Sequence, residues 1–343
     1  MSARTAISNE EREAFHTWTE LDDDLQGVSQ PLADTIFNAR VAFSRGDLSR
    51  TAYWKVPEGI DVIPDLQYLD DGTRAHKLDL YLPHDSVVRG GKTTPVYIDI
   101  HGGGFIYGHK ELNRNFCTNL AAQGFAVFSI NYRPAPQTDF IGQLQDVSSA
   151  FAWIKANRAN YPIAQDQVFV TGDSAGGTLA LYSTAIECSA SIAKEIGVVP
   201  SGLDIAGCTL ISPLTDLTPY LAKCVQGAEV DDNAGPTSMV ESIAPVFFKS
   251  FYERCVEVAD LPKLAGNVDF PSMFINTSND DFIQADSLKL ATALVDAGHD
   301  VELHAWHTRK GETLGHVFPV CMSWLTESRE TLGMIRDFTY SKL

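Results

Sequence analysis

The sequence predicts a mostly parallel, doubly wound α/β sheet with additional helical segments outside it. Short, nearly continuous apolar runs that end in glycine or proline are typical of strands buried on both faces of such a sheet. Segments with apolar residues at helical spacing separate these runs, and this alternation indicates parallel strands joined by crossover helices. Two polar stretches that also contain aromatic residues, 1–46 and 214–262, break the alternation and are expected to form a helical cap.

The predicted strands are runs of β-branched and aromatic residues bounded by turn residues. The run KLDLYLP alternates polar and apolar residues at period two, which favours a strand that Pro83 ends. In chain order the strand-forming runs are KLDLYLP (77–83), VYIDIHGGG (96–104), FAVFSINYRPAP (125–136), QVFVTG (167–172), LDIAGCTLISP (203–213), FPSMFINTS (270–278) and DVELHAW (300–306).

The predicted helices fill the intervals between these strands. Two amphipathic helices are expected within 8–46, where apolar residues recur at helical spacing. The other expected helices are 143–161, 174–197, 284–298 and a C-terminal helix from about 317. The chain therefore divides into an N-terminal helical cap segment (1–46), a first core part (47–213), a cap or lid insertion (214–262) and a second core part (263–343).

Composition and charge exclude several function classes. The formal net charge of −18 disfavours nucleic acid, anionic membranes and polyanionic substrates as partners. The N-terminus lacks a basic region followed by an apolar run, and no window approaches 18 apolar residues, so neither a secretory signal nor a membrane span is expected. The six scattered cysteines form no CxxC pair, which indicates free thiols in a reducing, cytoplasmic setting and no zinc pattern.

The stretch VFVTGDSAGGTLALY (168–182) contains the candidate nucleophile, Ser174. It runs from a predicted strand directly into a predicted helix, at the sheet edge where ligands of α/β proteins bind. A serine on such a sharp turn projects its hydroxyl away from the sheet, and flanking glycines avoid a clash of the crowded backbone. The following helix directs its positive end and the unpaired Ala175 N–H towards the turn.

The run His101-Gly102-Gly103-Gly104 is the second motif, at the end of an earlier strand. Consecutive glycines leave backbone N–H groups bare, which suits donors to a developing oxyanion. Glycine runs are also common in flexible loops, but the position before the serine favours an oxyanion role.

Together HGGGFIYG, NYRPAP, GDSAGG and a late GHVF resemble the hormone-sensitive-lipase-like carboxylesterase branch of the α/β-hydrolase superfamily, which is related to feruloyl-esterase-like bacterial enzymes. The resemblance covers roughly 65–212 and 268–320. It implies an α/β-hydrolase fold and an ester hydrolase with a serine-acid-histidine triad and no metal or organic cofactor. Two motifs depart slightly from the usual family wording, since NYRPAPQ and GHVF differ from it without loss of a catalytic group.

The base is predicted from the chain order serine, acid, histidine. His316 follows the last predicted strand and begins the last helix, as the family histidine does, and His307 is the alternative. His304 and His307 point to opposite faces of a strand, so they do not form a metal pair. His101 is expected to brace the glycine loop.

The acid is expected directly after the strand FPSMFINTS. The family has a small-residue turn before the acid and an apolar residue two positions after it. TSNDDF fits this pattern with Asp280 as the acid and Phe282 as the apolar residue, and Asp281 is the alternative. Asp173 beside the serine is interpreted as a turn residue that cannot reach the histidine.

The predicted chemistry is hydrolysis of small acyl or aryl esters through an acyl-enzyme. Ser174 attacks, His316 takes its proton, Asp280 orients the imidazole, and the N–H groups of Gly103, Gly104 and Ala175 hold the oxyanion. A feruloyl esterase, an acyltransferase or a peptidase would use the same triad. A non-catalytic receptor of this fold typically lacks the histidine.

The insertion 214–262 is expected to influence the substrate range. Its aromatic residues are predicted mainly to pack the insertion onto the core, with one or two lining the pocket: Tyr220, Phe247, Phe248, Phe251 and Tyr252. The edge strand after the acid offers one way for two copies to form a homodimer, and the sequence leaves the oligomeric state open.

Overall fold

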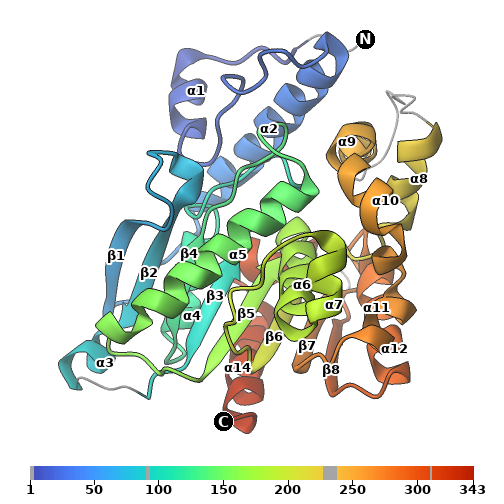
Figure 1. Ribbon diagram of the computed structural model, residues 1–343. Helices are drawn as coiled ribbons and strands as arrows, with labels where there is room; N and C mark the ends of the chain where they lie inside the picture. Colours follow the sequence, from blue (N-terminus) through green and yellow to red (C-terminus); the bar gives the residue numbers. More distant parts are fainter. Residues whose placement is uncertain (1–3, 90–92, 227–237, 310) are drawn as a thin grey trace.

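The chain is built around an eight-stranded sheet in the order β1-β2-β4-β3-β5-β6-β7-β8 (Figure 1). The computed structural model describes residues 4–89, 93–226, 238–309 and 311–343. Only the β1–β2 and β2–β4 pairs among these strands are antiparallel, so the predicted mostly parallel sheet is confirmed. The strands are β1 (Ile60–Gln67), β2 (Lys77–Pro83), β3 (Val96–Ile100), β4 (Ala126–Ile130), β5 (Val168–Asp173), β6 (Gly207–Ile211), β7 (Ser272–Ser278) and β8 (Val301–Trp306).

Helices cover both faces of the sheet. On one face α5 and α6 pack against side chains such as Ile98 and Val170, and on the other α4 and α14 pack against Tyr97 and Phe169 (Figure 1). The helices are α1 (Asn9–Phe15), α2 (Gln30–Thr51), α3 (His84–Arg89), α4 (Arg114–Ala121), α5 (Phe140–Asn157), α6 (Ala175–Cys188), α7 (Ala190–Ile196), α8 (Thr218–Gln226), α9 (Ser238–Phe247), α10 (Lys249–Cys255), α11 (Leu261–Asn267), α12 (Gln284–Asp296), α13 (Phe318–Cys321) and α14 (Thr326–Ser341).

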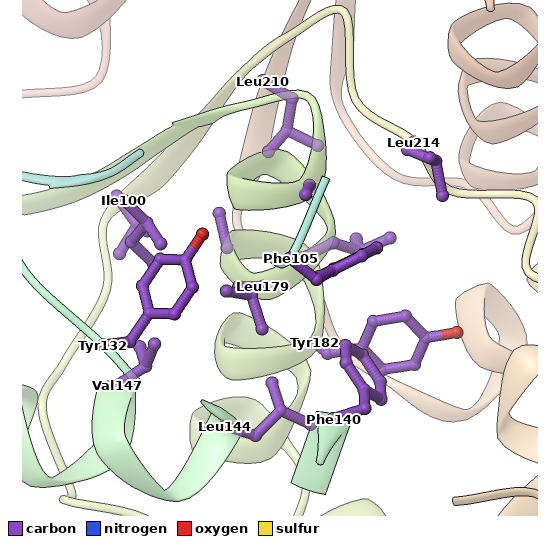
Figure 2. Close-up of a cluster of buried hydrophobic side chains, with 14 of the residues drawn as sticks. Ile100, Phe105, Tyr132, Phe140, Leu144, Val147, Leu179, Tyr182, Leu210 and Leu214 are labelled. Carbon is purple, nitrogen blue, oxygen red and sulfur yellow. The ribbon is translucent and has the colours of Figure 1, made fainter. Parts of the chain in front are cut away.

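The packing of α5 against α6 fixes the helix that follows the candidate nucleophile. Figure 2 shows Phe140 and Leu144 of α5 beside Leu179 and Tyr182 of α6. The rings of Phe140 and Tyr182 meet edge to face with centroids 5.5 Å apart, and Phe105 from the loop after β3 lies 5.9 Å from Phe140. The same buried cluster therefore supports the nucleophile helix and the glycine loop.

Several elements differ from the sequence prediction: helices α3 and α4 were not predicted, and α2 extends beyond residue 46 to Thr51. Strand β1 was not predicted, and the expected helix 174–197 is two helices, α6 and α7, that separate at Ser189. Ser189 leaves the helical conformation, and its side chain accepts a hydrogen bond from the Ile192 N–H at the start of α7. The expected C-terminal helix is a short α13 followed by α14, which begins at Thr326.

The two segments that the sequence sets apart from the sheet lie side by side. Helix α9 of the insertion contacts α2 of the N-terminal segment, and both lie above the sheet in Figure 1. Both helices also contribute side chains to the cavity that contains Ser174. Within the described part of the chain, no helix is long and apolar enough to cross a membrane.

Candidate active site

Ser174 occupies the sharp turn between β5 and α6. Its backbone has φ 52° and ψ −121°, a region that a residue with a side chain rarely adopts. The turn is held by hydrogen bonds from the Ser174 N–H to the Ile211 carbonyl (3.0 Å) and from the Leu214 N–H to the Ser174 carbonyl (3.1 Å). The strained turn thus directs the hydroxyl away from the sheet, as the sequence predicted.

The glycines around Ser174 are required by close backbone contacts. A Cβ atom on Gly172 would collide with the carbonyl of Gly176, and one on Gly176 would collide with the carbonyls of Ile100 and His101. Backbone atoms cannot rotate away as a flexible side chain can. Glycine is therefore required at both Gly172 and Gly176, as expected from the sequence.

His316 and Asp281 form a hydrogen-bonded chain with Ser174. The Ser174 Oγ lies 2.9 Å from His316 Nε2, and His316 Nδ1 lies 2.8 Å from Asp281 Oδ1. Because a carboxylate accepts, the neutral imidazole has its proton on Nδ1, and Nε2 is free to accept the serine proton. His307, the alternative base, is exposed beyond the end of β8.

The acid beside His316 is Asp281, so the sequence-based choice of Asp280 is wrong on geometry. Asp280 is exposed and accepts hydrogen bonds from Thr313 Oγ1 (2.6 Å) and the Leu314 N–H (3.2 Å). The side chain of Asp281 has no exposed area and points inward. The pattern of an acid followed two positions later by an apolar residue also fits Asp281 with Ile283.

The surroundings of Asp281 favour its charged form. Burial acts to raise the pKa of this carboxyl, but the hydrogen bond and charge of His316 outweigh burial, and the pKa is lowered. Thr277 Oγ1 (3.3 Å) and the Ile283 N–H (3.1 Å) also donate to the carboxylate. Asp281 therefore offers His316 a fixed negative charge.

The glycine loop after β3 faces the serine. Gly103 has φ +109° and Gly104 has φ +58°, so both adopt left-handed backbone conformations that favour glycine. Both residues line the cavity with Ser174. In the described part of the chain, the N–H groups of Gly103, Gly104 and Ala175 donate to no other residue, which leaves them available to an oxyanion.

Asp173 connects the nucleophile turn to the glycine loop. Its Oδ1 accepts from the Gly102 N–H (3.1 Å) and from Asn113 Nδ2 (2.8 Å), and the same Nδ2 lies 3.2 Å from Asp99 Oδ1. Burial raises the pKa of Asp173 to about 7 and that of Asp99 to about 6. Asp173 is thus more than a turn residue, although, as predicted, it does not pair with His316.

His101 braces the glycine loop, as the sequence suggested. Its Nδ1–H donates to the Gly102 carbonyl (2.8 Å), and its ring stacks on Tyr132 with centroids 4.4 Å apart. The Tyr132 hydroxyl donates to the His101 carbonyl (2.8 Å). Burial lowers the pKa of His101 to about 4, so the imidazole stays neutral.

The cavity around Ser174 has a volume of about 320 Å³. Its walls come from the sheet edge, from α2 and from α9, where Met239 and Val240 contribute side chains. Phe282 also lines it, with its ring 4.5 Å from that of His316. No local pattern in the sequence marks Met239 as a cavity residue, because its position depends on packing between distant segments.

The aromatic residues of the insertion pack onto the core instead of lining this cavity. Phe247 lies 5.0 Å from Phe105, and Phe251 lies 5.1 Å from Phe140, measured between ring centroids. None of the five aromatic residues named from the sequence is among the described residues that line the cavity around Ser174. The expectation that one or two of them line the pocket is therefore wrong for this cavity.

The N-terminal segment is tied to the glycine loop by buried polar contacts. Arg40 is fully buried, and its Nε–H donates to the Ile106 carbonyl (2.9 Å) while Asp24 pairs with its Nη atoms (2.6 and 2.8 Å). Further along α2, Asp47 Oδ2 accepts from the Tyr107 hydroxyl (2.7 Å). Helix α2 thus fixes the loop that carries the candidate oxyanion donors.

The described residues contain no group of three or more histidine, cysteine, aspartate or glutamate side chains that could hold a metal ion. His304 packs against Trp306, with ring centroids 4.7 Å apart.

Comparison with known families agrees with this geometry. A family model described as alpha/beta hydrolase fold matches residues 97–318, which include Ser174, Asp281 and His316. The chain belongs to this family. The resemblance drawn from the sequence motifs is therefore confirmed at the level of the fold and the family.

Relatives of the chain include proteins named as esterases and lipases, and also tuliposide A-converting enzymes of Tulipa gesneriana. The chain is 35% identical over 117 residues to a probable carboxylic ester hydrolase, LipM, of Mycobacterium tuberculosis, covering 34% of this chain and 26% of LipM. It is 26% identical over 217 residues to the esterase LipI of the same organism, covering 61% of this chain and 62% of LipI. The chain thus spans less than two thirds of the length of these curated relatives.

A similar solved structure is esterase B from Lactobacillus rhamnosis. It superposes with a TM-score of 0.78 at 27% identity and covers 91% of this chain and 96% of that one. The similarity therefore extends over most of both chains.

Proposed function

We propose that this protein is a serine carboxylesterase that hydrolyses small acyl or aryl esters. The observation that carries the proposal is the hydrogen-bonded chain from Ser174 through His316 to Asp281, with contacts of 2.9 and 2.8 Å. This arrangement has the geometry of a nucleophile, a general base and an orienting acid. The esterase names of the relatives support the same reaction.

The reaction proceeds in two halves. His316 Nε2 takes the proton of Ser174 as Oγ attacks the ester carbonyl, and Asp281 stabilises the imidazolium that forms. The N–H groups of Gly103, Gly104 and Ala175 hold the oxyanion, each contributing about 3 kcal/mol to the barrier reduction. His316 then protonates the leaving alcohol. In the second half, water attacks the acyl-enzyme with His316 again as base, which releases the acid and restores the serine.

The cavity supports a small substrate. A volume of about 320 Å³ lies at the lower end of the usual range of ligand pockets. Esterase B from Lactobacillus rhamnosis has been solved with a C4-C4 tributyrin phosphonate inhibitor, and this supports short acyl chains for the chain described here. The six unpaired cysteines support a reducing, cytoplasmic location.

The proposal is tested with p-nitrophenyl esters from acetate to decanoate and with methyl ferulate, comparing wild type and Ser174→Ala. Serine-dependent turnover that falls as the acyl chain lengthens is the expected result. A preference for ferulate would move the assignment to phenolic esters. Absence of serine-dependent turnover by folded protein would overturn ester hydrolysis and favour an acyltransferase or a ligand receptor.

A further inference from the structure

Arg50 is a cationic side chain at the wall of the candidate active site. It lies in the last turn of α2 and lines both the cavity around Ser174 and a second cavity of about 690 Å³. Its side chain is 33% exposed. Asp47 and Cys321, which contact its guanidinium, also line the inner cavity. Arg50 therefore stands at the boundary between the reaction site and the outer cavity.

The contacts of Arg50 leave one edge of the guanidinium open. Nη1 donates to Asp47 Oδ1 (2.9 Å) and lies 3.5 Å from Cys321 Sγ. Across the described residues, Nε and Nη2 have no hydrogen-bond partner. These two atoms form the edge with parallel N–H groups that matches the two oxygens of a carboxylate.

Asp47 holds Arg50 in place without occupying that edge. One carboxylate oxygen takes the Arg50 Nη1–H, and the other takes the Tyr107 hydroxyl at 2.7 Å. Tyr107 belongs to the loop that contains the candidate oxyanion donors, and its N–H donates to the Gly103 carbonyl (3.1 Å). The orientation of Arg50 is thus fixed relative to the reacting centre.

The charges around the inner cavity favour an anion at Arg50. Burial raises the pKa of Asp47 against the opposing hydrogen bonds of Tyr107 and Arg50, and burial raises that of Asp173 to about 7. With a pKa of about 7, Asp173 has less than a full negative charge near neutral pH, while the guanidinium of Arg50 keeps its charge. The outer cavity is lined by Arg309 and by three glutamates, Glu312, Glu327 and Glu330. Because the glutamates repel anions, an anion is favoured chiefly beside the Arg50 guanidinium.

We propose that Arg50 binds a free carboxylate on the substrate, so that this esterase prefers esters that carry one carboxylate in addition to the scissile ester bond. The inference rests on the proposed ester hydrolysis and names its substrate class. The carboxylate belongs to the acyl half or to the alcohol half of the ester, and the same guanidinium edge recognises either.

The test compares matched pairs of esters. Monomethyl glutarate and methyl 5-methylhexanoate differ only by a carboxylate in place of an isopropyl group on the acyl side. The pair 4-acetoxybutyrate and 4-methylpentyl acetate makes the same comparison on the alcohol side. We expect wild type to favour one of the two carboxylate esters in kcat/KM by about 30-fold, the size of a charge-assisted pair.

Arg50→Gln should remove this preference, because it lowers kcat/KM for the carboxylate ester at least about ten-fold more than for the neutral ester of the same pair. Arg50→Lys keeps a positive charge and should therefore retain part of the preference for the carboxylate ester. Arg45→Gln is the matched control, because Arg45 also lies on α2 but pairs with Glu11. Equal turnover of both members of each pair by wild type, or equal losses on both in Arg50→Gln, would overturn the proposal.

Binding separates this inference from the proposed function. Calorimetric titration of Ser174→Ala protein with monomethyl glutarate and with 4-acetoxybutyrate measures recognition without turnover. If the protein binds one of these probes and Arg50→Gln abolishes that binding, the carboxylate site is supported, even where wild type hydrolyses no ester. The absence of hydrolysis would then refute only the proposed ester hydrolysis. Absence of Arg50-dependent binding of both probes would overturn the carboxylate site, whether or not p-nitrophenyl esters are hydrolysed.

Discussion

Replacing each of the two adjacent aspartates after β7, Asp280 and Asp281, with asparagine separates their roles. Asp281→Asn replaces the carboxylate that lies 2.8 Å from His316 Nδ1 with an amide of the same shape. Its NH₂ group then donates to Nδ1 and stabilises the imidazole tautomer whose proton is on Nε2. In that tautomer His316 cannot accept the Ser174 proton. We expect kcat to fall about 10,000-fold, which corresponds to about 5 kcal/mol of barrier.

Asp280→Asn is the matched control. The Asp280 carboxylate is exposed and contacts Thr313 and Leu314, and the asparagine oxygen preserves one acceptor for them. We expect kcat within about three-fold of wild type, since surface substitutions rarely disturb a structure by more than 0.5 kcal/mol.

Both variants are assayed with p-nitrophenyl butyrate, and circular dichroism and thermal melting show whether each remains folded. A large loss of kcat in Asp280→Asn together with near-normal kcat in Asp281→Asn would show that Asp281 does not orient His316. That result would restore the acid first expected from the sequence.

Three further predictions follow from the cavity and its supports. Gly103→Ala should lower kcat by at least about 100-fold, and by more than Gly104→Ala does. A Cβ atom on Gly103 meets the rigid carbonyl of Tyr107, whereas a Cβ atom on Gly104 meets the flexible end of the Met239 side chain. Equal losses of kcat for the two variants in steady-state assays would contradict this prediction. Because the folded-state pKa of Asp173 is raised to about 7 from 3.8, the folded state holds the extra proton between these values. Stability should therefore fall as pH rises from 5 to 7, by roughly 2 kcal/mol, and Asp173→Asn should flatten urea-unfolding free energies over that window; an unchanged slope would exclude Asp173 as the source. Met239→Ala should shift the preferred p-nitrophenyl acyl chain to greater length, while Val246→Ala, at an exposed position of the same helix, should not; identical chain-length profiles would remove Met239 from the acyl wall.

The nucleophile, the base and the glycine loop were predictable because their determinants are local. GDSAGG and HGGG place strained, glycine-dependent turns directly after strands, and the late GHVF motif places His316 after the last strand, where the family histidine lies. The acid was harder, because Asp280 and Asp281 both satisfy the same pattern. Only the turn after Ser278 decides which carboxylate points inward, and the buried Ile283 rather than the exposed Phe282 marks the register.

Strand β1 was missed for a physical reason. Its sequence IDVIPDLQ contains Pro64, and Asp65 has φ +56° where the register with β2 shifts. Proline in a sheet is confined mainly to edge strands and bulges, and the bulge in β1 interrupts the alternating pattern that would have indicated a strand. Residues that line the cavity from α2 and α9, such as Arg50 and Met239, meet the site through long-range packing, which no local pattern encodes.

Ester hydrolysis with and without the Ser174 hydroxyl tests whether this protein is a serine esterase. Wild type and Ser174→Ala are compared on p-nitrophenyl butyrate, with folding of both checked by thermal melting. We expect turnover by wild type and a loss of at least about 10,000-fold in the variant. Equal activity of the two proteins, or no activity in folded wild type on any ester of the acetate-to-decanoate series, would contradict this expectation.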